Sequence, residues 1–218
     1  MKIDRKSQIT NHKSQITLFD FDGTLSMDDA NQGFYKYCFR HSLRPWLFVP
    51  VILCGAVLWL ISFVLVRLCI ISNISRLAVL WREMLRMFYT PALVERLLPG
   101  FISEFRQNRF GWAKDQIAKE KENGNIVILS SAGPDYLIIP LVRDMGFDYI
   151  ITSNSDPLRP WKILFFNYGE NKVESLKAIA RAPMTVVRAY SDSESDLPMM
   201  NLARAQVWID PKTGLRKN

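Results

Sequence analysis

The sequence contains little cysteine, and its cysteines are not spaced for cross-linking or for metal binding. The three residues are Cys38, Cys54 and Cys69, and no two of them form a C-x-x-C pair. This spacing indicates neither a disulfide framework nor a zinc site. We therefore expect the protein to function in a reducing compartment.

The beginning of the chain lacks an apolar core. Residues 1–13 are polar and carry four basic side chains, so they do not form a cleavable secretory signal, and we expect the catalytic part to be cytoplasmic. The segment 6–10, K-S-Q-I-T, recurs as residues 13–17, but one short repeat does not indicate a solenoid. We predict that residues 1–15 are a polar N-terminal tail.

Residues 46–66 lack charge altogether, although Arg44 and Arg67 flank them. The run is long enough to resemble a membrane span. The alternative is a buried helical hairpin, and hydrophobic periodicity does not separate the two. Of these interpretations we favour membrane contact.

The overall composition is that of a folded protein with a basic surface. Hydrophobic residues make up 49% of the chain and charged residues 22%, which excludes disorder over most of its length. The net charge is +7, from 28 Lys and Arg against 21 Asp and Glu. Such an excess favours anionic partners, among them acidic lipid and phosphorylated substrates.

Short apolar runs alternate with amphipathic segments along much of the chain. The runs that predict buried strands are residues 16–21, 126–129, 149–152 and 185–189, and the predicted helices are residues 101–122, 134–145 and 172–182. Alternating strands and helices are typical of a parallel sheet covered on both faces. The sequence therefore predicts an α/β fold with a Rossmann-like parallel sheet core.

Two carboxylates, Asp20 and Asp22, follow the first apolar strand, within L-F-D-F-D-G-T-L. Strand alternation points them to one side, at the sheet edge where parallel sheets bind ligands. Because the carboxylates repel each other, the pair implies a hard cation such as Mg²⁺. An ordinary Asp-Gly turn would require neither Asp20 nor Thr24.

This stretch resembles the first motif of the haloacid dehalogenase-like superfamily, and three further motifs follow in the family's order. The second is a Ser closing an apolar strand, which fits Ser131, with Ser130 as the alternative. The third is a basic residue near a helix start, which fits Lys172, with Lys162 as the alternative. The resemblance implies that these groups bind and neutralise a transferring phosphoryl group.

The fourth motif is Y-S-D-S-E-S-D-L-P at residues 190–198, and it resembles the family's G-D-S-x-x-D-x-P pattern. Ser191 stands where glycine is usual, but both carboxylates, Asp192 and Asp196, are retained. The resemblance implies that Asp192 binds Mg²⁺ together with the Asp20 carboxylate and the Asp22 backbone carbonyl, while Asp196 supports the site.

The resemblance also implies a reaction, that of a phosphoric monoester hydrolase. Asp20 attacks phosphorus and forms an aspartyl-phosphate, while Asp22 protonates the leaving oxygen and then activates water. Lys172 and Ser131 balance the developing charge, with Thr24 and Asp196 in support. The resemblance is to the phosphoserine phosphatase-like branch of the superfamily, and it implies Mg²⁺ as the cofactor.

The long segment between the first two motifs governs the choice of substrate in this superfamily. We predict a helical cap over residues 29–123, carrying the apolar segment 46–66, and a catalytic core over residues 16–28 and 124–218. An uncharged run inside the cap resembles the bacterial phosphatidylglycerophosphatase C group, which implies a lipid substrate, phosphatidylglycerophosphate, and a role in phospholipid biosynthesis.

A single membrane span at residues 46–66 would separate Asp20 from the other motifs, so the run must be re-entrant, interfacial or buried. The expected location is the cytoplasmic face of the inner membrane, with the cytoplasm as the alternative. Four basic residues would face anionic headgroups, namely Arg67, Arg76, Arg82 and Arg86. No nucleic-acid partner is expected. Two other functions remain open, a soluble phosphatase of a metabolite such as phosphoserine and a non-enzymatic membrane-binding protein.

Overall fold

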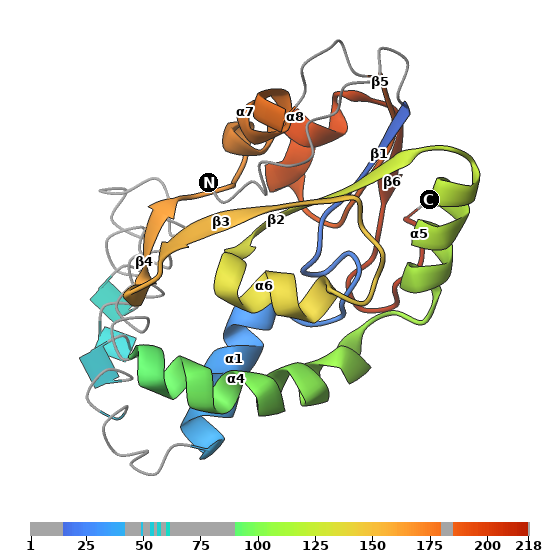
Figure 1. Cartoon of the computed structure of the whole chain (residues 1–218). Helices are drawn as coiled ribbons and strands as arrows, with labels where there is room; N and C mark the ends of the chain where they lie inside the picture. The colour runs from blue at the N-terminus through green and yellow to red at the C-terminus, as the bar shows by residue number, and fades with distance from the viewer. Residues whose placement is uncertain are drawn as a thin grey trace.

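The computed structural model describes residues 15–41, 49, 53–54, 56–57, 60–61, 90–179 and 185–217. Six strands form one sheet in the order β4-β3-β2-β1-β5-β6 (Figure 1). They are β1 (Gln15–Phe19), β2 (Ile126–Pro134), β3 (Tyr149–Asp156), β4 (Arg159–Phe165), β5 (Thr185–Ser191) and β6 (Ala203–Trp208). The helices are α1 (Ala30–His41), α4 (Pro91–Phe105), α5 (Trp112–Glu122), α6 (Asp135–Val142), α7 (Glu170–Ile179) and α8 (Leu197–Met200), with 3-10 turns η2 (Arg106–Asn108) and η3 (Glu194–Asp196).

The central strand β1 shows how the sheet separates two cores. Ile16 and Leu18 belong to a buried cluster with Leu176 of α7, whereas Phe19 belongs to a second cluster with Leu137 of α6. Side chains alternate between the two faces of a strand, so one short apolar strand contributes to both layers. The prediction of an α/β sheet covered on both faces is confirmed.

The pairing of β1 brings distant segments of the chain together. Its neighbours β2 and β5 are both parallel to it, with Phe19 opposite Leu129 on one side and Tyr190 on the other. The carboxyl ends of these three strands therefore meet at one edge, as expected for a ligand-binding parallel sheet. The edge strand β4, which was not predicted from the sequence, runs antiparallel to β3, so the sheet is mostly parallel.

The predicted helix over residues 101–122 is wrong in its extent, since the structure has two helices there. Helix α4 begins earlier, where the Thr90 hydroxyl caps the chain by accepting from the Leu93 backbone N–H at 3.2 Å. It ends at Phe105, and α5 starts at Trp112. Between them the backbone pairs with the loop after β1, where the Phe110 N–H donates to the Leu25 carbonyl at 3.0 Å.

Helix α5 lies against the sheet although it falls within the predicted cap. Its buried Glu120 accepts hydrogen bonds from Thr17 of β1 and contacts Arg188 of β5. Helices α1 and α4 pack together below the carboxyl edge of the sheet (Figure 1). The boundaries of the cap and the core remain predictions. The contacts above show that α5 packs on the sheet, whereas α1 and α4 pack on each other.

The apolar run 46–66 is described at seven residues, all of them helical and exposed. Its large described side chains are Val49, Leu53, Val57, Leu60 and Ile61, each between 45% and 60% exposed. In the described part of the chain, no helix combines the length and the apolar character that crossing a membrane requires. The four predicted headgroup arginines and residues 1–14 of the predicted tail lie outside the described residues.

Candidate active site

A cavity of about 280 Å³ lies at the carboxyl edge of the sheet. It is lined by residues that follow β1 and β5, by the last residues of β2, and by residues at the starts of α1 and α7: Asp20, Asp22, Asp29, Asn31, Ala132, Gly133, Tyr168, Lys172, Asp192, Ser193, Ser195 and Asp196. Three of the four motifs line it directly. The topology thus brings together residues that are more than 150 positions apart in the sequence.

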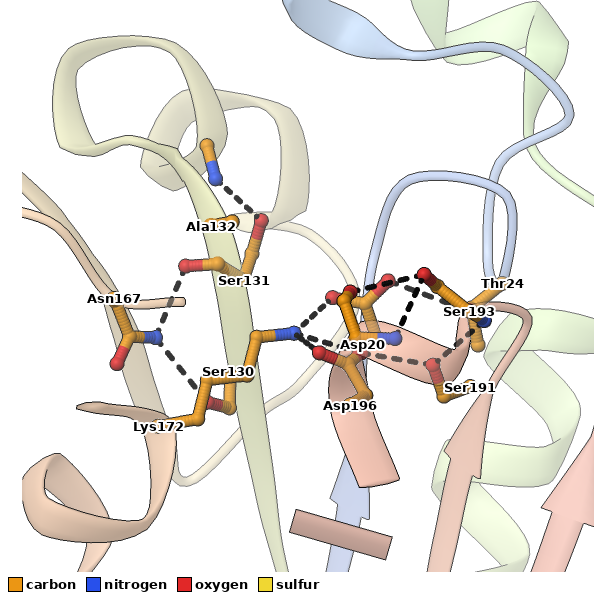
Figure 2. Close-up of polar contacts among 12 residues, drawn as sticks. Asp20, Thr24, Ser130, Ser131, Ala132, Asn167, Lys172, Ser191, Ser193 and Asp196 are labelled. Carbon is orange, nitrogen blue, oxygen red and sulfur yellow. Dashed lines mark hydrogen bonds and ion pairs between the residues drawn. The ribbon is translucent and has the colours of Figure 1, made fainter. Parts of the chain in front are cut away.

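Lys172 is the central cation of the site. It lies in the first turn of α7, only 2% exposed, and its Nζ is 2.7 Å from Asp20 Oδ1 and 2.8 Å from Asp196 Oδ2 (Figure 2). A buried ammonium requires such partners, and the two carboxylates raise its pKa against the opposing effect of burial. The alternative Lys162 is exposed on β4 and does not line the cavity.

Asp20 is buried directly beyond β1, where its backbone N–H still donates to the Tyr190 carbonyl at 3.0 Å. Burial raises the pKa of Asp20 to about 7, although Lys172 opposes the rise. One oxygen, Oδ1, accepts from Lys172, and the other accepts from the Thr24 hydroxyl at 3.3 Å. The position of this carboxylate is therefore fixed on both sides.

Thr24 also connects Asp20 with the fourth motif. Its hydroxyl lies 3.1 Å from Asp192 Oδ1, so the two carboxylates share one hydroxyl neighbour. Gly23 is needed for this approach, because its φ is +75° and an added Cβ would lie 2.3 Å from Asp192 Oδ2. The D-G-T part of the first motif is thus explained by its contact with the fourth.

Asp22 is half-buried and accepts a hydrogen bond at 2.7 Å from the Ala30 backbone N–H, the first residue of α1. Burial and the nearby Asp29 carboxylate raise the pKa of Asp22 well above its usual value. A protonated carboxyl at this point is a suitable proton donor.

The serines of the second motif lie behind the cavity wall. Both are buried, and neither lines the cavity, which Ala132 and Gly133 do instead. The Ser131 hydroxyl accepts from the Gly133 N–H at 3.0 Å, whereas the Ser130 hydroxyl accepts from Asn167 Nδ2 at 3.2 Å (Figure 2). Ser131 is therefore the serine coupled to the cavity wall, and Ser130 belongs to the packing behind it.

Two residues that hold the site were not predicted as such. Asn167 is fully buried and also donates to the Ser131 carbonyl at 3.0 Å, which fixes the second-motif loop. The Ser191 hydroxyl donates to Asp196 Oδ2 at 2.8 Å and accepts from the Ser193 N–H. This contact explains why serine fits where the family pattern has glycine, while the sequence near Asn167 carries no motif that would have identified it.

The donor set fits a hard divalent cation. Among the described residues no three His, Cys, Asp or Glu side chains are arranged to hold a metal ion, so a site here would use the Asp20 and Asp192 carboxylates with other oxygens. Burial raises the pKa of both Asp20 and Asp192, and the neighbouring Asp196 carboxylate adds to the rise in each case. A cation such as Mg²⁺, which prefers oxygen ligands, would offset the charge of these carboxylates.

Known proteins resemble this chain in sequence and in fold. A family model described as haloacid dehalogenase-like hydrolase matches residues 17–201. Probable phosphatase Rv3661 of Mycobacterium tuberculosis is 31% identical over 114 residues, which covers 50% of this chain and 40% of that protein. Protein CicA of Caulobacter vibrioides is 27% identical over 201 residues, covering 88% of this chain and 84% of CicA.

Solved structures show the same fold at low sequence identity. A protein of unknown function from Bordetella pertussis Tohama I has a TM-score of 0.70 at 17% identity, covering 93% of this chain and 92% of that one. A phosphoserine phosphatase, in a phospho-aspartyl intermediate analogue, has a TM-score of 0.60 at 18% identity, covering 90% and 87%. These matches establish the architecture of the core.

Proposed function

The chain belongs to the haloacid dehalogenase-like hydrolase family, and on that premise we propose that it is a Mg²⁺-dependent phosphatase with Asp20 as its nucleophile. The observation that carries the proposal is the 2.7 Å contact between Lys172 Nζ and Asp20 Oδ1 in a cavity that Asp22 and Asp192 also line. A non-enzymatic membrane-binding protein would have no need for these groups to converge.

The proposed reaction has two steps. In the first, Asp20 attacks phosphorus, the bond from phosphorus to the leaving oxygen breaks, and Asp22 gives its proton to that oxygen. In the second, Asp22 takes a proton from a water molecule, and the water oxygen attacks phosphorus. The bond from phosphorus to Asp20 breaks, which releases inorganic phosphate and restores the Asp20 carboxylate. The raised pKa of Asp22 supports the proton transfer in the first step.

The other residues of the cavity would hold the phosphoryl group and its charge. Lys172 faces Asp20 and would contact a phosphoryl oxygen there, while Asp196 keeps its ammonium in place. The Asp20 and Asp192 carboxylates, with the Asp22 backbone carbonyl, would bind Mg²⁺, which supplies charge neutralisation at the phosphoryl oxygens. We propose that Ser131 acts through Gly133, whose N–H donates to the Ser131 hydroxyl and which forms part of the cavity wall that would face the phosphoryl group.

We propose a lipid substrate, phosphatidylglycerophosphate, at the cytoplasmic face of the inner membrane. Support comes from the apolar run, because Val49, Leu53, Val57 and Ile61 are exposed and spaced by four residues, as on one face of a helix. An exposed apolar stripe is favourable against lipid and unfavourable in water, at about 25 cal/mol per Å². Among the described residues of the proposed cap, these exposed apolar side chains are the ones that a lipid surface would cover.

A substrate panel tests both parts of the proposal. Purified protein with Mg²⁺ would be given phosphatidylglycerophosphate in mixed micelles, phosphoserine and an aryl phosphate, with phosphate release as the measurement. We expect hydrolysis of all three, with kcat/KM for the lipid at least about tenfold above the others. A higher value for phosphoserine would favour a soluble metabolite phosphatase, and no hydrolysis of any ester would refute the phosphatase assignment.

A further inference from the structure

Asn31 is the second residue of α1, and it lines the cavity near the Asp29 carboxylate. Its side chain is 5% exposed, and its Oδ1 has no hydrogen-bond partner in the described part of the chain. Other buried polar atoms without a partner are found on Asn125, Asn167 and Ser175, but these residues do not line the cavity.

A buried carbonyl oxygen without a hydrogen-bond partner, such as Asn31 Oδ1, is unfavourable, because native proteins pair nearly all such groups. When the group forms the wall of a cavity, the missing partner is supplied by whatever fills the cavity. The phosphoryl end of a substrate has its own partners, since Lys172 lies against the Asp20 nucleophile. Asp22, the proposed proton donor to the leaving oxygen, accepts from the N–H of Ala30, the neighbour of Asn31, so Asn31 is placed to contact the leaving alcohol.

The chemistry of the surroundings narrows the group that Asn31 meets. Asp29, whose Oδ1 accepts from the Gln32 N–H at 2.9 Å, also lines this part of the cavity, and its carboxylate would repel an anionic group. A hydroxyl is neutral, and it both donates and accepts, as a carboxamide does. It therefore complements Asn31 whichever of the two amide atoms faces the ligand.

We propose that Asn31 is a specificity-determining residue that hydrogen-bonds a hydroxyl on the alcohol side of the phosphate ester. The inference rests on the proposed phosphatase function and deepens it. In phosphatidylglycerophosphate this group is the free hydroxyl of the terminal glycerol, on the carbon next to the one that carries the phosphate ester. The contact selects phosphorylated polyols over simple alkyl phosphates.

The test compares glycerol 3-phosphate with propyl phosphate, which has the same carbon chain without hydroxyls. We expect the wild type to prefer glycerol 3-phosphate in kcat/KM, and Asn31→Leu, which has nearly the same shape, to reduce that preference about tenfold. The matched control is Gln32→Leu on the exposed side of α1, which should leave the preference unchanged.

A binding measurement separates specificity from folding. Calorimetry with glycerol 3-phosphate on Asp20→Asn, with and without Asn31→Leu, should show about tenfold weaker binding in the double variant, at an unchanged thermal midpoint. Equal losses on both esters, or no loss on either, would refute the role of Asn31. If Asn31→Leu lowered kcat/KM for phosphoethanolamine by the same factor, the group that Asn31 recognises would be an amine and the hydroxyl proposal would be wrong. A wild type inactive on every ester would instead refute the proposed function, and this inference with it.

Discussion

The Asp20 carboxylate is the residue on which the proposed chemistry depends. Asp20→Asn should lower kcat by at least roughly 10³-fold, because an amide does not form the aspartyl-phosphate. The fold should persist, since Asp196 still pairs with Lys172. Phosphate release and circular dichroism measure the two effects, and substantial residual turnover would exclude Asp20 as the nucleophile.

Asp192 has a different expected role, that of a Mg²⁺ ligand. Asp192→Asn should raise the Mg²⁺ concentration needed for half-maximal activity by about 10–100-fold, because it removes one of the two carboxylates that Thr24 connects. Asp115→Asn, at an exposed position on α5, is the control. If the Mg²⁺ dependence of both variants matched that of the wild type, the ligand assignment would be wrong.

Ser191 shows that a departure from a family pattern can be structural. Ser191→Ala removes a buried hydrogen bond to the Asp196 carboxylate and should lower the free energy of unfolding by about 1.5–3 kcal/mol. Ser175→Ala is a matched control, because that buried hydroxyl has no partner among the described residues. Urea unfolding measures both, and equal values would mean that the contact to Asp196 adds nothing.

At the scale of elements, Glu120 links α5 to the sheet through hydrogen bonds and an ion pair. Its carboxylate is fully buried and accepts from Thr17 at 3.0 Å and Asn125 at 2.8 Å, and it pairs with Arg188 of β5. Glu120→Gln replaces one accepting oxygen with an NH₂ group, which cannot accept a hydrogen bond from these donors, and it removes the charge that pairs with Arg188. The free energy of unfolding should therefore fall by about 3 kcal/mol at pH 7. Urea unfolding of the two proteins measures the difference.

The pH dependence of that difference follows from the pKa of Glu120. Burial raises this pKa, but the hydrogen bonds from Asn125 and Thr17 and the charge of Arg188 outweigh burial, so the pKa lies below its usual value. A lowered folded-state pKa stabilises the protein above the unfolded pKa of about 4.3, and the contribution is lost as pH falls through the folded value. The gap between wild type and Glu120→Gln should therefore shrink below about pH 4, and a constant gap would contradict the charged network.

At the scale of the whole molecule, the exposed apolar side chains bear on where the enzyme works. A double change, Leu53→Asp with Leu60→Asp, should weaken sedimentation with anionic vesicles and lower turnover of lipid in mixed micelles, because both side chains are 57% exposed or more. Hydrolysis of an aryl phosphate should persist. Leu215→Asp, at a position 67% exposed near the C-terminus, is the control. A loss of both activities would mean that the run is structural core.

Sequence by itself predicted the layering of the fold and the residues of the candidate site. Short apolar runs predicted β1, β2, β3 and β5. The resemblance to four family motifs predicted that Asp20, Lys172, Asp192 and Asp196 would meet. The structure brings these four residues together around one cavity. Local patterns are sufficient here, since strand alternation and the carboxyl edge of a parallel sheet follow from backbone geometry alone.

Only the tertiary structure decided the contacts between distant segments. The break between α4 and α5 exists because residues 108–110 pair with the loop after β1, a contact that helix propensity does not record. Asn167, Asn31 and Glu120 belong to no motif, and their roles arise from burial beside partners or beside the cavity. A buried polar group has lost its hydrogen bonds to water, so it needs a hydrogen-bond partner from elsewhere in the chain. Which residue becomes that partner is decided by the fold.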